Sequence, residues 1–203
     1  FMTKIKKLLE MVCFNCGKIL VDESNPDFKA AVRYRDPKRR FETIWKLCKP
    51  KMMCEADAPT EEDEGSAKSQ EKRHKHGGCG NMQPEVRQKG LQLRGTWKVP
   101  KDEDNEGGME PEKKQITPAN ALNVFRSIST EEIRDLGLST DYARPEWMII
   151  TGLPVPPPPV RPSISIDGSG QGMRREDDLT YKLGDIIRAN GNVRQAQPEG
   201  SPA

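Results

Sequence analysis

Aromatic residues are scarce in this chain of 203 residues, at 5%, and hydrophobic residues make up only 33% against 32% for charged ones. Such a composition excludes one large hydrophobic core, because too few apolar side chains are available to fill it. Seventeen prolines and seventeen glycines point the same way, since both residues interrupt regular elements. We expect a small folded domain accompanied by long polar segments.

Long apolar runs are also missing. No stretch approaches the roughly 18 residues that a membrane-crossing helix needs. The first residues do not resemble a secretory signal, because Lys4, Lys6 and Lys7 precede only a short apolar patch that Glu10 interrupts. We therefore expect no membrane partner and a location in the nucleus or cytosol.

Net charge is low but unevenly distributed. The whole chain carries 33 − 31 = +2, whereas residues 1–54 alone hold thirteen Lys or Arg against six Asp or Glu. A basic end of this kind favours contact with nucleic acid or another polyanion. The alternative is an ordinary solvated basic surface.

The five cysteines are an odd number in a chain without a secretory signal, which favours reduced thiols and a metal over disulfides. Cys13-Phe14-Asn15-Cys16-Gly17 has the spacing of half a tetrahedral zinc site, with a glycine to close the turn. A thiol redox pair is the alternative, but it requires a preceding strand and a helix starting at the motif. Here a predicted helix precedes and a strand-like run follows. Five residues are candidates for the other half of the site: Cys48, Cys54, Cys79, His74 and His76.

The helical spacing of apolar residues indicates whether Cys48 is a ligand. It shares an apolar stripe with Phe41, Ile44 and Trp45 in a helix predicted over residues 38–49, so we expect a buried side chain and not a ligand.

The remaining candidates differ in their surroundings. Cys54 follows Pro50 and a short predicted strand, and Cys79 lies among glycines that let the backbone fold around an ion. His74 and His76 are flanked by lysine and arginine, whose positive charge opposes cation binding.

Periodicity predicts an α+β fold with short helices and a small antiparallel sheet. Helices are expected at 3–11, 26–34, 38–49 and 177–190, with a helical hairpin within 116–143. Strands are expected at 18–22 and 51–53, and a β-hairpin or small three-stranded unit at 84–100. The predicted organisation begins with a zinc-binding domain at 1–100, which contains a disordered charged insertion at 55–76. An acidic linker at 101–115 and the helical hairpin at 116–143 follow. The chain then continues with a strand and polyproline strap at 144–165, and with a polar loop, amphipathic helix and tail at 166–203.

Two segments of the C-terminal part allow more than one interpretation. The proline run at 156–159 favours a stiff strap, with a ligand for SH3 or WW domains as the alternative. The apolar face of the last helix has no downstream partner, which predicts a truncated chain: Leu179, Leu183, Ile186 and Ile187.

Several motifs together resemble the N-terminal clamp portion of the largest subunit of nuclear RNA polymerase II, of fungal type. The resemblance covers the chain apart from its two charged loops. It rests on residues 144–165, Cys13 to Lys18, Arg39-Arg40-Phe41 with Ile44-Trp45, Lys51 to Cys54, Gly77 to Asn81, and Glu176 to Thr180.

This resemblance implies one structural Zn²⁺ held by four cysteines: Cys13, Cys16, Cys54 and Cys79. It also implies a nuclear location, membership of a much larger multi-domain subunit, and a clamp that closes over the DNA template and the DNA-RNA hybrid beside other polymerase II subunits. The parent enzyme is a nucleotidyltransferase whose Mg²⁺ is held by an Asn-Ala-Asp-Phe-Asp-Gly-Asp run. No such run occurs here, so we assign no catalytic residue and no Mg²⁺ to this chain.

Candidate phosphate contacts are basic residues near the thiol pair: Lys6, Lys7, Lys38, Arg39 and Arg40. A hypothesis of another class is a free-standing zinc-binding transcription factor or adaptor.

Overall fold

The computed structural model describes residues 1–56, 77–98 and 111–200, apart from residues 167, 169, 171, 197 and 199. The predicted disordered insertion lies outside the described residues for all but its first two and includes His74 and His76. The same holds for residues 101–110 of the predicted acidic linker. Internal contacts divide the chain into two compact units, residues 1–150 and residues 151–203.

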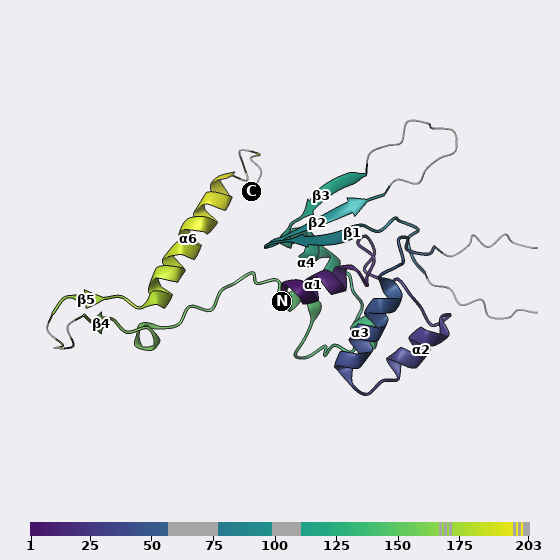
Figure 1. Ribbon diagram of the computed structural model, residues 1–203, viewed down its shortest axis with the longest axis horizontal. Helices are drawn as coiled ribbons and strands as arrows, with labels where there is room; N and C mark the ends of the chain where they lie inside the picture. The colour runs from purple at the N-terminus through teal and green to yellow at the C-terminus, as the bar shows by residue number, and fades with distance from the viewer. Residues whose placement is uncertain are drawn as a thin grey trace, which may run out of the picture. The chain divides into compact units, whose positions relative to one another are not determined.

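Three helices form much of the N-terminal part of the first unit: α1 (Met2–Leu9), α2 (Pro26–Val32) and α3 (Pro37–Cys48) (Figure 1). The two later helices begin where the sequence predicts. Asn25 and Asp36 accept backbone N–H bonds from the first turns, and a proline follows each cap. Helix α1 ends just before the thiol pair and buries the apolar stripe that its spacing predicts.

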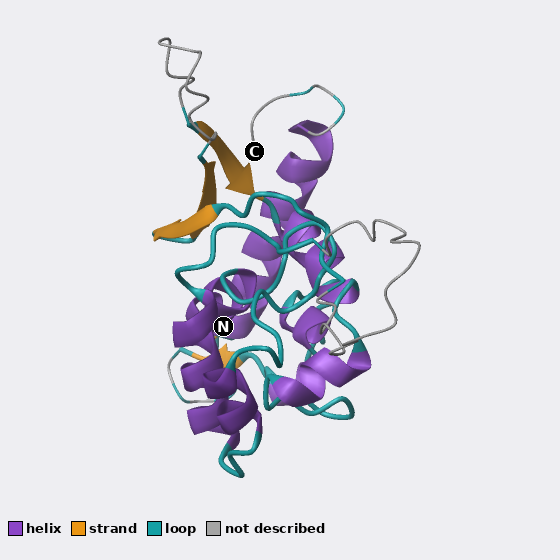
Figure 2. Ribbon diagram, turned by 90° about the vertical axis from the view of Figure 1, so that its right-hand side faces the viewer, coloured by secondary structure: helices purple, strands orange, loops and turns teal. Residues whose placement is uncertain are grey.

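A three-stranded antiparallel sheet follows, with β1 (Glu85–Lys89), β2 (Gln92–Trp97) and β3 (Glu112–Ile116) side by side in that order (Figures 1 and 2). The predicted hairpin is confirmed. The linker predicted over 101–115 is wrong at its end, because residues 112–115 belong to β3. Four exposed residues precede the buried Ile116 in this strand, so the sequence carries no alternation that would reveal it.

Two of the predicted strands are not strands in the structure, and each forms only a single β-bridge. The segment 18–22 pairs only through Ile19 with Val12, and the segment 51–53 only through Met53 with Met82. The first ribbon cannot lengthen, because the thiol turn closes one end and α1 precedes the other. The cysteine loops leave no room for longer ladders at these two places.

The helical hairpin is confirmed as α4 (Pro118–Arg126) and α5 (Thr130–Asp135). Thr117 caps α4, and Ser129 with Glu132 forms a capping box at the start of α5. The apolar run after Arg144 is not a strand. It begins with the 3-10 helix η1 (Pro145–Met148), because a proline with fixed φ and no amide hydrogen suits a helix start.

The core of the first unit joins α1, α3 and the helical hairpin. Its largest side chains are at most 1% exposed: Leu8, Met11, Phe41, Ile44, Phe125, Ile133 and Leu136. Cys48 is fully buried among them, as its place on the α3 stripe predicts.

The second unit contains η2 (Pro158–Val160), the short pair β4 (Ile164–Ser165) and β5 (Arg174–Arg175), and α6 (Asp178–Ala196). Arg161 donates to the Pro156 carbonyl at 2.8 Å and to Thr180 Oγ1 at 3.0 Å, so it joins the proline run to α6. Helix α6 continues beyond the predicted end at residue 190. The sequence did not predict its last turns, because they carry no apolar period.

Apolar residues of α6 are solvent-exposed, among them Ile186 at 50% and Ile187 at 72%. None of the described helices has the length and apolar character to cross a membrane.

The burial of α1 generates a stability prediction. Leu8→Ala removes a side chain with no exposed surface, and we expect a loss of about 2–5 kcal/mol in the free energy of unfolding. Leu91→Ala is the matched control, since Leu91 is 89% exposed and should change stability by less than about 0.5 kcal/mol. Urea denaturation followed by circular dichroism measures both. Equal losses would contradict the assigned core.

Candidate metal centre

Four cysteine sulfurs converge in the first unit. Those of Cys13, Cys16, Cys54 and Cys79 all lie within 4.8 Å of one another, and this is the only such cluster among the described His, Cys, Asp and Glu residues. Cys13 Sγ lies 3.4 Å from Cys79 Sγ, and Cys16 Sγ lies 3.8 Å from Cys54 Sγ. The described structure therefore brings together the four cysteines that the resemblance selects.

The first two cysteines sit on a tight turn. The Cys13 amide donates to the Lys18 carbonyl at 2.7 Å, and the Gly17 amide donates to the Cys13 carbonyl at 2.9 Å. Gly17 has φ of 79°, the left-handed conformation that glycine adopts at low cost. The turn thereby presents both thiols on one side.

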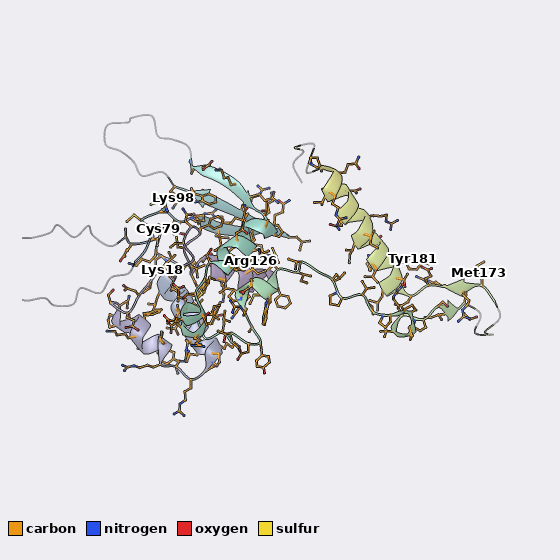
Figure 3. The ribbon with its side chains drawn as sticks, turned by 180° about the vertical axis from the view of Figure 1, so that it is seen from behind. Lys18, Cys79, Lys98, Arg126, Met173 and Tyr181 are labelled. Atoms are coloured by element: carbon orange, nitrogen blue, oxygen red, sulfur yellow. The ribbon has the colours of Figure 1, made fainter. Side chains whose placement is uncertain are left out.

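The other two cysteines come from segments that lie side by side. Around the Met53–Met82 bridge, the Cys54 amide donates to the Asn81 carbonyl at 3.0 Å. Gly77 and Gly80 flank Cys79 with φ of 66° and 74°, which lets this segment curve toward the thiol turn. Figure 3 shows Cys79 and Lys18 in the same region, and the Lys18 side chain lies against Gly77.

Amide groups surround the sulfurs. Gln83 Nε2 and Asn81 Nδ2 donate to the sulfurs of Cys13 and Cys79, each at 3.2 Å, and the Asn15 amide donates to Cys13 at 3.4 Å. Such N–H groups stabilise negative charge on sulfur.

The pKa values of the thiols follow burial and these contacts. Burial, and then the neighbouring thiols, raise the pKa values of Cys16 and Cys54. Burial also opposes ionisation of Cys79, but the backbone and side-chain amides of Asn81 outweigh it and lower the pKa of Cys79 to about 7. The cluster thus contains one readily ionised thiol, and a cation would favour ionisation of the others.

The cluster fits zinc. Tetrahedral coordination with Zn–S bonds of about 2.3 Å separates the sulfurs by about 3.8 Å, close to the separations of 3.4 and 3.8 Å in the two sulfur pairs. Four thiolates complete the coordination shell, so such a site leaves no position for an activated water. The chemistry that this donor set supports is structural crosslinking and not hydrolysis.

Cys48 stands apart from this cluster. Burial raises the pKa of its thiol to about 12, so it remains a protonated, apolar core residue. His74 and His76 lie outside the described residues.

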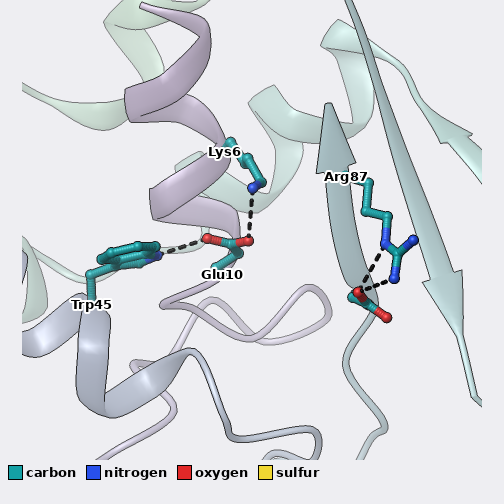
Figure 4. Close-up of polar contacts among 5 residues, drawn as sticks. Lys6, Glu10, Trp45 and Arg87 are labelled. Carbon is teal, nitrogen blue, oxygen red and sulfur yellow. Dashed lines mark hydrogen bonds and ion pairs between the residues drawn. The ribbon is translucent and has the colours of Figure 1, made fainter. Parts of the chain in front are cut away.

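The basic residues predicted to meet nucleic acid differ in their contacts. Lys6 pairs with Glu10 at 3.4 Å, and Glu10 also accepts from Trp45 Nε1 at 2.7 Å (Figure 4). Lys7 donates to both carboxylate oxygens of Glu42 at 2.6 and 2.7 Å, and this bond lowers the pKa of Glu42.

Three further basic residues stand at the start of α3. Arg40 donates to the carbonyls of Tyr34 and Arg134, each at 3.0 Å. Lys38 and Arg39 are exposed, and the Arg39 guanidinium lies 4.4 Å from the centre of the Tyr34 ring. These two side chains are the most accessible of the five.

Sequence reasoning missed two residues of this centre. Gln83 and Asn81 contact the sulfurs, yet neither is a metal ligand and neither lies in a ligand spacing. The sequence offers one indication of their role, which is that the polar residue Gln83 stands between the apolar residues Met82 and Pro84.

The fold and this cluster define a small α+β protein whose distant segments can be crosslinked by a metal ion. A family model described as "RNA polymerase Rpb1, domain 1" matches residues 1–203, and the chain belongs to this family. It is thus the N-terminal region of a largest RNA polymerase subunit, as the sequence motifs predict. The parent enzyme is a DNA-directed RNA polymerase, a nucleotidyltransferase that works with other subunits and nucleic acid in transcription.

Because the chain belongs to this family, it is not a free-standing transcription factor or adaptor. A thiol redox pair would require a strand before Cys13 and a helix that starts at the motif. Instead, the helix α1 precedes the motif and ends at Leu9, and no described helix begins at the thiol pair.

The thiol turn gives a second prediction. A Cβ added at Gly17 would lie 2.6 Å from the backbone carbon and oxygen of Ser127, whereas one at Gly90 would meet nothing within 4 Å. Gly90→Ala, at φ of 61°, should cost about 1–2 kcal/mol of unfolding free energy for its left-handed backbone alone.

Gly17→Ala should cost clearly more, because the contact with Ser127 adds to the same backbone strain. Denaturation in zinc-containing buffer measures the difference. Equal costs for the two variants would refute the close packing of the turn against Ser127.

Proposed function

We propose that this chain is the zinc-bearing clamp region of the largest subunit of RNA polymerase II, of fungal type, acting in the nucleus. One Zn²⁺ is held by Cys13, Cys16, Cys54 and Cys79, and the clamp closes over the DNA template and the DNA-RNA hybrid. The observation that carries the proposal is the convergence of four sulfurs within 4.8 Å in a chain of the Rpb1 family.

Zinc supplies stability that the sequence otherwise lacks. The thiol turn and the segment around Cys79 contain little regular structure. Gln83 joins them through hydrogen bonds to the Phe14 amide at 2.8 Å and to Cys13 Sγ at 3.2 Å. Structural zinc contributes about 10–16 kcal/mol of apparent binding free energy in small domains. A crosslink of this strength is large compared with the marginal stability of an ordinary domain.

The assignment to polymerase II rests on residues 156–163, within the stretch 144–165 that carries the resemblance. Four consecutive prolines precede Val160-Arg161-Pro162-Ser163, a combination that resembles polymerase II more than its polymerase I and III relatives. Arg161 has a defined place in this segment through its bonds to Pro156 and Thr180. The proline run is therefore tied to α6 within the second unit.

Nucleic-acid contact is proposed for the exposed start of α3. Lys38 and Arg39 are free of carboxylate partners among the described residues, unlike Lys6 and Lys7. Backbone phosphates are contacted by such side chains without regard to sequence, and the binding weakens with salt.

Metal analysis of single Cys→Ser variants tests the zinc site. We expect one zinc per chain in the wild type and its loss in variants of Cys13, Cys16, Cys54 and Cys79, because a missing thiolate opens the coordination shell. Cys48→Ser is the matched control and should retain zinc, since its thiol lies in the core of the first unit. Release of zinc by Cys48→Ser alone would overturn the ligand assignment.

Binding to duplex DNA and to a DNA-RNA hybrid tests the clamp surface. Lys38→Glu with Arg39→Glu should weaken binding and reduce the slope of log affinity against log salt by about 1–2, roughly one for each lost phosphate contact. The control pair is Lys113→Glu with Lys114→Glu on β3, which makes the same change of charge elsewhere. If both pairs weaken binding equally, net charge and not this surface explains the affinity.

A further inference from the structure

Gln83 is the single buried polar side chain among the described residues, with 3% of its surface exposed. A buried amide is costly unless its polar atoms are paired. Here each polar atom has a partner. Gln83 Oε1 accepts from the Phe14 amide at 2.8 Å, and Nε2 donates to the Asn81 carbonyl at 2.8 Å and to Cys13 Sγ at 3.2 Å.

The chemistry of the neighbours determines the orientation of this amide. A backbone N–H is only a donor, so the Gln83 oxygen must face Phe14. A carbonyl and a thiolate are acceptors, so the nitrogen must face Asn81 and Cys13. The contact with sulfur is therefore a donated N–H bond and does not depend on an arbitrary choice between oxygen and nitrogen.

We propose that Gln83 is a positioning residue of the metal centre, which holds the Cys13 thiolate and joins the thiol turn to the segment that carries Cys79. This inference rests on the proposed zinc site. Four thiolates around a dication leave a net charge of about −2. Cys13 is fully buried, so water cannot offset this charge at its sulfur, and the Gln83 amide supplies the N–H group instead.

Asn81 makes the matching contact in the opposite environment. Its Nδ2 also donates to a cluster sulfur at 3.2 Å, but Asn81 and Cys79 are both exposed. Water can replace the lost donor there. The two amides therefore form a natural comparison, with the same bond to sulfur in a buried and in an exposed place.

The test replaces each amide by the carboxylate of the same shape, as Gln83→Glu and Asn81→Asp. Gln83→Glu keeps the acceptor for the Phe14 amide but puts a negative charge in place of the N–H donor. A role limited to supporting Phe14 would survive this change, whereas the positioning role would not. Gln115→Glu is the matched control, because Gln115 is exposed on β3.

Two readouts are taken on the full chain: zinc affinity by competition with a chelator, and the charge-transfer band of the Co²⁺-substituted protein. For Gln83→Glu we expect affinity about 10- to 100-fold weaker, the usual effect of losing an outer-shell partner, and a band at lower energy because the sulfur loses its N–H bond. Asn81→Asp should have a smaller effect and Gln115→Glu none.

A measurement on the wild type keeps the test independent of how the variants fold. In protein loaded with an NMR-active cadmium isotope, the Gln83 side-chain amide protons should show scalar coupling to the metal through the sulfur. Absence of this coupling, or a Gln83→Glu variant that matches Gln115→Glu in affinity and spectrum, would overturn the positioning role alone. A wild-type chain that binds no zinc would instead refute the zinc site of the proposed function.

Discussion

The convergence of four sulfurs from distant parts of the chain is the constraint on which the first unit depends. Cys13 and Cys79 are 66 positions apart in the sequence, and Cys16 and Cys54 are 38 apart, yet the two sulfurs of each pair lie within 4 Å of each other. Bringing distant ligands together costs little more than bringing near ones together, because the entropy of loop closure grows only with the logarithm of loop length. The backbone must nevertheless turn sharply at each ligand, which explains the positive φ at Gly17, Gly77 and Gly80.

That constraint also limits regular structure near the cluster. Segments that reach the sulfurs pair with each other through single bridges and not through ladders. The helices and the three-stranded sheet form instead where no ligand has to be presented. Burial in the first unit is therefore shared between a conventional hydrophobic core and a polar centre in which amide groups face sulfur.

Local signals in the sequence were sufficient for the helices, because caps, prolines and apolar stripes act over a few residues. Asn25, Asp36, Thr117 and Ser129 all cap helices, and each is followed closely by the apolar positions of its helix. The buried position of Cys48 followed from the same local periodicity. Strand β3 could not be predicted, because its residues are polar and its only reason to be extended is the pairing with β2.

For the metal centre, the residues alone left histidines open as ligands, and the choice of four cysteines required the resemblance to a known family. The structure adds what neither could supply. Gln83 and Asn81 lie beside the sulfurs because the segment after Cys79 runs antiparallel to the segment before Cys54, a long-range arrangement without a short-range pattern. Likewise, Lys6 and Lys7 of α1 look available in the sequence but are paired with Glu10 and Glu42.

Glu132 shows how closely the two halves of the first unit depend on each other. One of its oxygens accepts from the Ser129 amide and hydroxyl and so completes the capping box of α5. The other oxygen accepts from the Ile19 amide at 3.0 Å, on the ribbon that closes the thiol turn. One carboxylate thus serves a neighbour three positions away and another 113 positions away. A change at this single position would loosen a helix end and the support of the cysteine ribbon together, although it touches no sulfur.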